Sequence, residues 1–203
     1  MKIGIIGAGT VGSSLGAAWA KNGHTIMYGV RDPDSDKTRK AVSTSGAVLV
    51  GTLAEAAAFG DVIVLSVPWT ALPETLAVLG DLGGKILVDV INAFSPPSVE
   101  HGSVGHDVAA WAQNARVVKA FNTMGAETMS NPDFNGQNAT AFIAGDDADA
   151  KKTVIQLAND IGLDGIDAGP LANSVYLEGL TKLWASLARG GLGRDIAFKL
   201  IRR

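Results

Sequence analysis

A glycine-rich segment near the start of the sequence limits the possible fold more than any other feature. Residues 7–12 read G-x-G-x-x-G, directly after an apolar run at 3–6 and at the opening of a helical pattern over 10–21. In this setting the three glycines permit a tight turn, a close approach of the backbone to a pyrophosphate, and close packing of the helix on the strand. The free amides of the helix N-terminus attract the anion. The segment therefore predicts a dinucleotide-binding site formed by Gly7, Ala8, Gly9, Thr10, Val11 and Gly12.

Short apolar runs alternate with helical patterns along the next hundred residues. Uninterrupted β-branched runs of this kind are typical of parallel strands that are covered on both faces. They predict an α/β fold with a doubly wound, mainly parallel Rossmann sheet of strand order 3-2-1-4-5-6. The six predicted strands are at 3–6, 25–30, 48–50, 61–66, 86–89 and 117–120, and the polar stretch at 31–46 separates the second from the third.

The remainder of the chain predicts a small appendage to this sheet. A strand at 138–144, a helix at 147–161 and a strand at 165–168 precede a helix that starts at Pro170, because proline is favoured in a first turn. Asp146 and Asp147 are expected to cap the 147–161 helix. We therefore expect one domain over 1–203, with a cofactor-binding core at 1–135. The extension at 136–203, of αβ and helical character, would close the substrate crevice.

The end of the second predicted strand distinguishes the two nicotinamide cofactors. NAD-binding domains usually place an acid about twenty residues beyond the glycines, where it holds the ribose 2′-hydroxyl. Here that position falls near Val30, and Arg31 follows. An arginine suits the 2′-phosphate of NADP through charge-assisted contacts. Asp32 lies just beyond and would either cap a turn or hold a ribose. We interpret Arg31 as a cofactor contact and NADP(H) as the cofactor.

Further cofactor contacts are expected after the fourth and fifth strands. In a doubly wound sheet, ligands bind outside the carboxyl ends of the strands at the point where the strand order reverses. These positions would border the nicotinamide half, although Pro68 and Asn92 are equally typical of ordinary turns. The expected contacts are Ser66, Val67 and Pro68 after the fourth strand, and Asn92 and Ala93 after the fifth.

The composition argues against several classes of function. The chain has a net charge of −3, with acidic and basic residues interspersed, and no cysteine. The interspersed charges predict no basic surface for nucleic acid or an anionic membrane. The absence of cysteine excludes a thiolate nucleophile and a thiolate metal site. The first twenty residues imitate a signal peptide, but five glycines interrupt the apolar stretch. We expect a cytoplasmic protein.

The three histidines offer only weak catalytic candidates. His24 lies in the turn before the second strand, where a solvated role is expected. His101 and His106 lie in the predicted loop after the fifth strand, on the crevice side. Either could protonate a substrate nitrogen or belong to a lid, but an ordinary surface loop is favoured. Their spacing predicts no metal site.

Apolar residues of the last helix follow a helical spacing. Such a stripe places Trp184 in the core or a subunit interface rather than against a cofactor. It also makes a homodimer the expected assembly. The stripe is formed by Tyr176, Leu180, Leu183, Trp184 and Leu187.

Several segments together resemble one known family. The opening KIGIIGAGTVGSSLG recurs with SVPW at 66–69, VVKAFNTMG at 117–125, AGDD at 144–147 and DAGPLANSVYLEGL at 167–180. In this combination the chain resembles the NADPH-dependent coenzyme F420 reductases, whose Rossmann half is shared with pyrroline-5-carboxylate reductases and metalloreductases. The resemblance spans nearly the whole chain. Its first motif is generic, whereas those at 117–125 and 167–180 are more particular.

The resemblance implies hydride exchange between NADPH and a small redox partner, F420 or a flavin, stacked on the nicotinamide. It also implies a substrate crevice walled by Asn122, Thr123, Met124, Gly125, Leu171 and Asn173, beside Asn92 and Ala93. Family members commonly carry Ser-Arg at the second strand end and a lysine four residues after the arginine. This chain has Val30, places Ser35 at the lysine position and has Lys37 two residues further on. Its partner therefore need not be F420.

Ring-to-ring hydride transfer needs alignment and water exclusion more than acid–base groups. An NADP-dependent oxidoreductase is therefore the leading interpretation, and no catalytic residue is assigned. Imine reduction of the pyrroline-5-carboxylate reductase type is a second one, although that chain would carry a longer helical dimerisation region. An NADP-binding sensor without turnover is a third, because no acid–base pair is evident.

Overall fold

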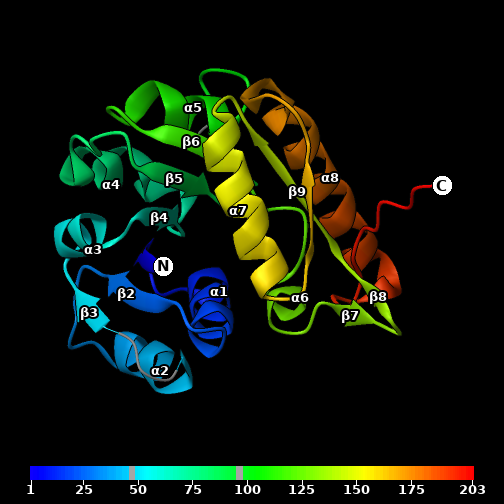
Figure 1. Cartoon of the computed structure of the whole chain (residues 1–203), viewed down its shortest axis with the longest axis horizontal. Helices are drawn as coiled ribbons and strands as arrows, with labels where there is room; N and C mark the ends of the chain where they lie inside the picture. Colours follow the sequence, from blue (N-terminus) through cyan, green and yellow to red (C-terminus); the bar gives the residue numbers. More distant parts are fainter. Residues whose placement is uncertain (46–48, 95–97) are drawn as a thin grey trace.

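A single eight-stranded sheet runs through the molecule (Figure 1). The computed structural model of the chain describes residues 1–45, 49–94 and 98–203. The strand order is β10-β9-β6-β5-β4-β1-β2-β3, so the predicted order 3-2-1-4-5-6 is confirmed. The strands are β1 (Lys2–Ile6), β2 (Thr25–Gly29), β3 (Leu49–Gly51), β4 (Val62–Leu65), β5 (Ile86–Asp89), β6 (Arg116–Lys119), β9 (Thr140–Gly145) and β10 (Asp164–Asp167).

The helices cover both faces of this sheet. Two clusters of buried apolar side chains lie on opposite faces, one beneath α1, α6 and α7 and the other beneath α3, α4 and α5. The central strands must therefore be apolar on both faces, which explains the uninterrupted apolar runs of the sequence. The helices are α1 (Thr10–Lys21), α2 (Asp36–Ser45), α3 (Leu53–Phe59), α4 (Leu72–Leu79), α5 (Val104–Trp111), α6 (Ala126–Ser130), α7 (Ala148–Asp160) and α8 (Ser174–Leu187).

The C-terminal residues extend the Rossmann sheet with reversed strand direction. Strand β9 is antiparallel to β6, and β10 is parallel to β9. Strands β6 and β9 pair only at Val118 with Gly145 and at Lys119 with Ala144. Most of β9 therefore runs beyond the carboxyl end of β6, on the edge where a Rossmann sheet binds its ligand. A two-stranded hairpin of β7 (Asp133–Phe134) and β8 (Gln137–Asn138) precedes β9.

Contacts between α1 and α7 join this extension to the first half of the fold. The indole of Trp19, fully buried on α1, donates a hydrogen bond to the Leu157 carbonyl of α7 (2.9 Å) and packs edge-on against Phe121. His24 Nε2 lies 3.1 Å from an Asp160 carboxylate oxygen, and the His24 side chain is only 8% exposed. The solvated role expected for His24 is therefore wrong, because α7 covers the turn before β2.

Local sequence signals account for several helix ends. Thr52 and Glu55 form a capping box at α3, with each side chain accepting a backbone N–H of the other. Asp147 caps α7 as predicted, by accepting the Ala150 N–H (2.7 Å). Asp146 instead accepts the N–H of Leu171 (2.9 Å), so its predicted capping of α7 is wrong.

Two segments for which the sequence analysis predicted no helix contain one in the structure. The stretch at 31–46, described only as polar, contains α2, and His106, expected in a loop, lies in the first turn of α5. Residue 48, assigned to the third strand, is outside the described residues. These short helices lack a long apolar period, so local pattern does not separate them from loops.

The last helix also differs from its prediction. Pro170 precedes a single 3₁₀ turn, Leu171–Asn173, and α8 begins only at Ser174. Trp184 is buried as predicted, where its indole donates to the Ile196 carbonyl (2.8 Å). However, the buried face of α8 is otherwise formed by Ser174, Leu177 and Thr181, whereas most of the predicted stripe, Tyr176, Leu183 and Leu187, is exposed.

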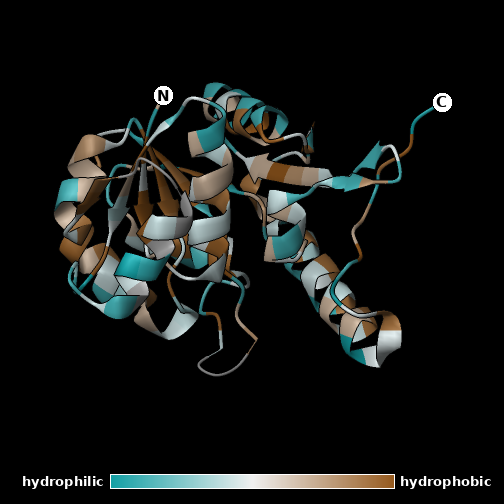
Figure 2. Cartoon of the chain, turned by 90° about the horizontal axis from the view of Figure 1, so that it is seen from below, coloured by the Kyte–Doolittle hydropathy of each residue, from teal (hydrophilic) through white to brown (hydrophobic). Residues whose placement is uncertain are grey.

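Figure 2 shows the apolar strands at the centre of the molecule and the far end of α8 standing clear of its body. Among the described residues, no helix is long and apolar enough to cross a membrane.

Candidate cofactor-binding site

A cleft of about 650 Å³ opens at the carboxyl ends of β1, β2, β4 and β5. Most of the predicted cofactor residues line it, and Gly12 and Ala93 do not. The predicted residues in its wall are Gly7, Ala8, Gly9, Thr10, Val11, Arg31, Ser66, Val67, Pro68 and Asn92.

The three glycines between β1 and α1 differ in their surroundings. Gly7 has φ = 106°, a conformation that only glycine adopts easily. A Cβ atom at Gly12 would lie 2.3 Å from the Gly7 carbonyl oxygen, so the helix can approach the turn only without a side chain there. A Cβ atom at Gly9 would meet no atom within 4 Å. Gly9 therefore leaves open space in the cleft, beside the free amides of the α1 N-terminus, where a pyrophosphate fits.

The end of β2 places one cation in the mouth of the cleft. Arg31 is exposed there, and Asp32 follows it. The Asp32 carboxylate accepts the Asp34 N–H (3.0 Å), while its carbonyl accepts the hydroxyls of Ser35 and Thr38 (3.0 Å each). Asp32 thus forms the turn into α2, one of the two roles left open for it. The side chain of Lys37 lies outside the described residues.

Sequence reasoning missed part of the wall. Ser35 reaches the cleft from the segment before α2, and Thr38 reaches it from the first turn of α2. Trp69 also lines the cleft and lies in the segment after β4 that was expected to border the nicotinamide. Trp69 stacks on Trp111 of α5, with ring centroids 5.9 Å apart. Thr75 and Val78 of α4 also line the cleft, together with Ala71, the residue that precedes the helix. Their i, i+4, i+7 spacing is the signal of one helix face that could have identified them.

The other end of the cleft is formed by the turn after β5. Val90, Ile91, Asn92 and Phe94 line it. The side chain of Asn92 is fixed from behind, because its amide donates to the Asn122 carbonyl (3.1 Å) and its own oxygen accepts the Asn122 amide (3.1 Å). In a doubly wound sheet this half of the switch point borders the nicotinamide.

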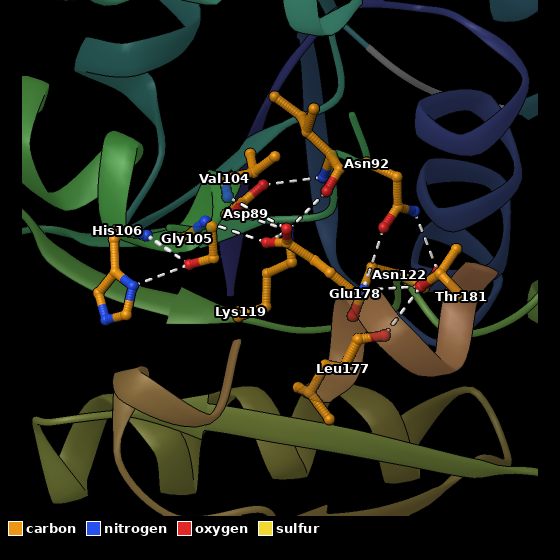
Figure 3. A network of polar contacts seen from close by, with 12 residues as sticks. Asp89, Asn92, Val104, Gly105, His106, Lys119, Asn122, Leu177, Glu178 and Thr181 are labelled. Atoms are coloured by element: carbon orange, nitrogen blue, oxygen red, sulfur yellow. Dashed lines mark hydrogen bonds and ion pairs between the residues drawn. The ribbon is translucent and has the colours of Figure 1, made fainter. Parts of the chain in front are cut away.

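Two fully buried charges lie beneath that turn (Figure 3). Asp89 and Lys119 are register partners at the ends of β5 and β6, and Lys119 Nζ donates to Asp89 (2.9 Å) and to the Ile91 carbonyl (2.5 Å). Burial raises the pKa of Asp89, while the ammonium of Lys119 and the Ile91 N–H act in the opposite direction. Such a pair costs several kcal/mol per ion to desolvate and offsets that cost only when its hydrogen bonds are complete.

The substrate-crevice residues implied by the resemblance lie behind this cleft rather than in its wall. Asn122, Thr123, Met124, Gly125 and Leu171 are buried. Asn173 is half-buried, and its amide donates to the Ala168 carbonyl (2.6 Å). Their role as a crevice wall stays a prediction.

The two weak catalytic candidates, His101 and His106, form side-chain contacts within the segment that carries them. His101 Nδ1 lies 2.7 Å from the fully buried carboxylate of Asp107, which also accepts the His101 N–H. His106 Nδ1 lies 3.0 Å from the hydroxyl of Ser103, the residue that caps α5. Neither histidine lines the cleft. Within the described residues, no three histidine, aspartate or glutamate side chains gather as a metal site.

Comparisons with known proteins agree with this geometry. Residues 2–93 match the family model described as NADP oxidoreductase, coenzyme F420-dependent. The F420-dependent NADP reductase of Methanocaldococcus jannaschii is 31% identical over 92% of this chain and 92% of its own length. Rat metalloreductase STEAP3 is 29% identical over 88% of this chain, which spans 36% of that longer protein.

Comparisons with solved structures agree with these sequence comparisons. A crystal structure from Arthrobacter sp. FB24, provisionally assigned as an F420-dependent NADP reductase, superposes with a TM-score of 0.89 and 31% identity over the full length of both chains. A reductive aminase from Aspergillus terreus, in complex with NADPH, superposes over 93% of this chain and 63% of its own (TM-score 0.71, 21% identity) and shares the fold.

The Rossmann sheet and its glycine-lined cleft therefore define an NADP(H)-dependent oxidoreductase that acts on a small redox substrate. Within that class, the chain belongs to the family of coenzyme F420-dependent NADP oxidoreductases.

Replacing Gly9 by alanine separates cofactor binding from folding. The backbone of Gly9 (φ −77°, ψ −175°) admits alanine, and the new methyl group would project into the cleft. We expect Gly9→Ala to weaken NADPH binding at least about tenfold, or ~1.4 kcal/mol, with an almost unchanged melting temperature. Fluorescence titration and thermal unfolding measure the two effects. Gly12→Ala is the matched control and should instead destabilise the fold. Unchanged NADPH affinity in Gly9→Ala would place the pyrophosphate elsewhere.

Proposed function

We propose that the protein exchanges a hydride between NADPH and F420, or a flavin, stacked on the nicotinamide in this cleft. The names of the relatives from Methanocaldococcus jannaschii and Methanothermobacter thermautotrophicus, both F420-dependent NADP reductases, support F420. The observation that carries the proposal is the lining of the nicotinamide end, where Val90, Ile91, Asn92 and Phe94 include no titratable side chain. Ring-to-ring hydride transfer is the chemistry that such a wall permits.

Residues along the cleft would bind different parts of the cofactor. NADPH supplies the hydride when bound. The α1 amides near Gly9 bind the pyrophosphate, Arg31 binds the 2′-phosphate, and Asn92 orients the nicotinamide end. Trp69 and Phe94 exclude water, because they add apolar surface to the wall. His101 and His106 take no part in this mechanism.

The acceptor is tested by mixing the purified protein with NADPH and following the absorbance of the reduced nicotinamide. We expect oxidation with F420 or FMN well above the rate without protein. The Gly9→Ala variant is the control for turnover in this cleft. Oxidation only with a cyclic imine would favour the imine-reductase alternative. Tight NADPH binding without consumption by F420, FMN, ferric chelates or imines would favour the sensor.

The preference for NADPH is tested at Arg31. A charge-assisted hydrogen bond contributes about 1.5–3 kcal/mol, so Arg31→Ala should weaken NADPH binding about tenfold or more and leave NADH binding nearly unchanged. Arg39→Ala is the matched control, because Arg39 is an exposed α2 residue paired with Asp36 and outside the cleft wall. Equal losses for both cofactors would refute a 2′-phosphate contact.

We also propose a homodimer formed through α8. The exposed residues Tyr176, Leu183 and Leu187 of α8, a helix whose far end stands clear of the body, support it (Figure 2). Leu183→Glu should shift the protein from dimer to monomer in analytical ultracentrifugation, and Lys182→Glu, also exposed on α8, should not. A wild-type monomer at micromolar concentration would contradict the proposal.

Two further proposals concern organisation and location. We propose that 1–203 is one domain in which 136–203 closes the crevice of 1–135, supported by the continuous sheet and by the length of β9 beyond β6. A cytoplasmic location is proposed because the residues that imitate a signal peptide form β1 and α1 of the cofactor site. We propose no nucleic-acid or membrane partner, in keeping with the net charge of −3.

A further inference from the structure

Helix α8 reaches the strand ends beneath the cleft through the side chain of Glu178. One carboxylate oxygen lies 3.2 Å from Lys119 Nζ. The carboxylate also accepts the backbone N–H groups of Val104 (3.2 Å) and Gly105 (3.3 Å) at the start of α5 (Figure 3). Glu178 is therefore held on three sides, although it does not line the cleft.

A second side chain of α8, Thr181, holds Asn122. The Thr181 hydroxyl accepts the Asn122 amide (2.9 Å) and lies 2.9 Å from the Asn122 carbonyl and 3.0 Å from that of Leu177. Asn122 Oδ1 is buried without a hydrogen-bond partner among the described residues. Within the described part of the chain, the Asn122 side-chain amide is therefore held by Thr181 on one side and by Asn92 on the other.

These contacts converge on the turn that forms the nicotinamide end of the cleft. Asp89 accepts the Ile91 N–H (2.8 Å), and Lys119 donates to the Ile91 carbonyl. Side chains thus hold both backbone groups of Ile91, and Asn122 holds the side chain of Asn92. Buried polar groups of this kind add little net stability but restrict the arrangement of the elements that they join. The position of Ile91 and Asn92 therefore depends on α8.

We propose that Thr181 and Glu178 are positioning residues for hydride transfer, which set Asn92 and Ile91 against the nicotinamide without touching it. The proposal rests on the proposed function for its kinetic consequence. Thr181 acts on Asn92 through Asn122, and Glu178 acts on Ile91 through Lys119. Misplacement of a reacting ring by about 1 Å costs up to roughly 100-fold in rate, so a contact remote from the ring is sufficient to alter catalysis.

The test compares NADPH with 2′-phospho-ADP-ribose, which lacks the nicotinamide ring. Thr181→Val keeps the side-chain volume and removes the hydroxyl. We expect its Kd for NADPH to rise about fivefold and that for the fragment to change less than about twofold, a coupling of ordinary size. The single-turnover rate of hydride transfer should fall by about tenfold. Thr181→Ser, which keeps the hydroxyl, should restore the wild-type values. Thr181→Ala gives a second test if the valine variant fails to fold.

Controls distinguish positioning from a loss of stability. Thr153→Val removes the same hydroxyl bond to a carbonyl four residues earlier, but on α7, and should leave both affinities unchanged. In an Asn92→Ala background, Thr181→Val should have no further effect on the ratio of the two affinities. Equal losses for NADPH and the fragment, a lowered melting temperature alone, or failure of Thr181→Ser to rescue would overturn the proposal.

The failure of the proposed function would look different. If none of the acceptors led the wild-type protein to oxidise NADPH, the proposed hydride transfer would be refuted. The two affinities would still decide whether α8 positions the nicotinamide end of the cleft.

Discussion

The close approach of α1 to the turn after β1 is the contact on which the cofactor site depends. With no side chain at Gly12, the first turn of the helix lies against the Gly7 carbonyl, and its free amides face the cleft. These amides and the helix dipole provide the anion site without any charged side chain. The opposite wall, from β4 and α4, can then contribute mainly apolar groups such as Trp69 and Val78.

The nicotinamide half of the cleft is held by side chains, in contrast to the backbone amides of the anion site. Here the strand ends carry the buried pair of Asp89 and Lys119, and the turn above them is held by side chains rather than by a backbone ladder. Removing one partner of such a pair would leave an uncompensated buried charge, at a cost of about 3–5 kcal/mol. The arrangement therefore tolerates little change, whereas exposed Arg31 at the adenosine end has no such constraint.

Much of the fold followed from local pattern, and some of the site did not. The strand order and the turn of Gly7, Gly9 and Gly12 are encoded in neighbouring residues, so they were predictable. The reversed direction of β9 and the buried face of α8 depend on contacts between distant segments, which periodicity does not report. For the same reason Thr38 was missed as a cleft residue. His106 was placed in a loop because the short helix α5 lacks a long apolar period.

The pairing of Lys119 with Asp89 and Glu178 was equally hidden, because a single lysine within an apolar strand has no local signature. The resemblance to a known family did mark residues 117–125 as particular, but by similarity and not by chemistry. The structure shows the physical role of residues in this segment. They connect the last helix of the chain to the turn after β5.

The contact of Trp19 with Leu157 has a thermodynamic consequence. Helix α1 carries the anion site at its first residue and contacts α7 of the extension near its last turn. A rigid helix of 12 residues transmits a displacement at one end to the other. If occupancy of the anion site changes the packing of the extension, the two are linked equilibria, in which each changes the other by the same free energy. Amide hydrogens of α7, far from the glycines, should then report the binding of a dinucleotide through slower exchange.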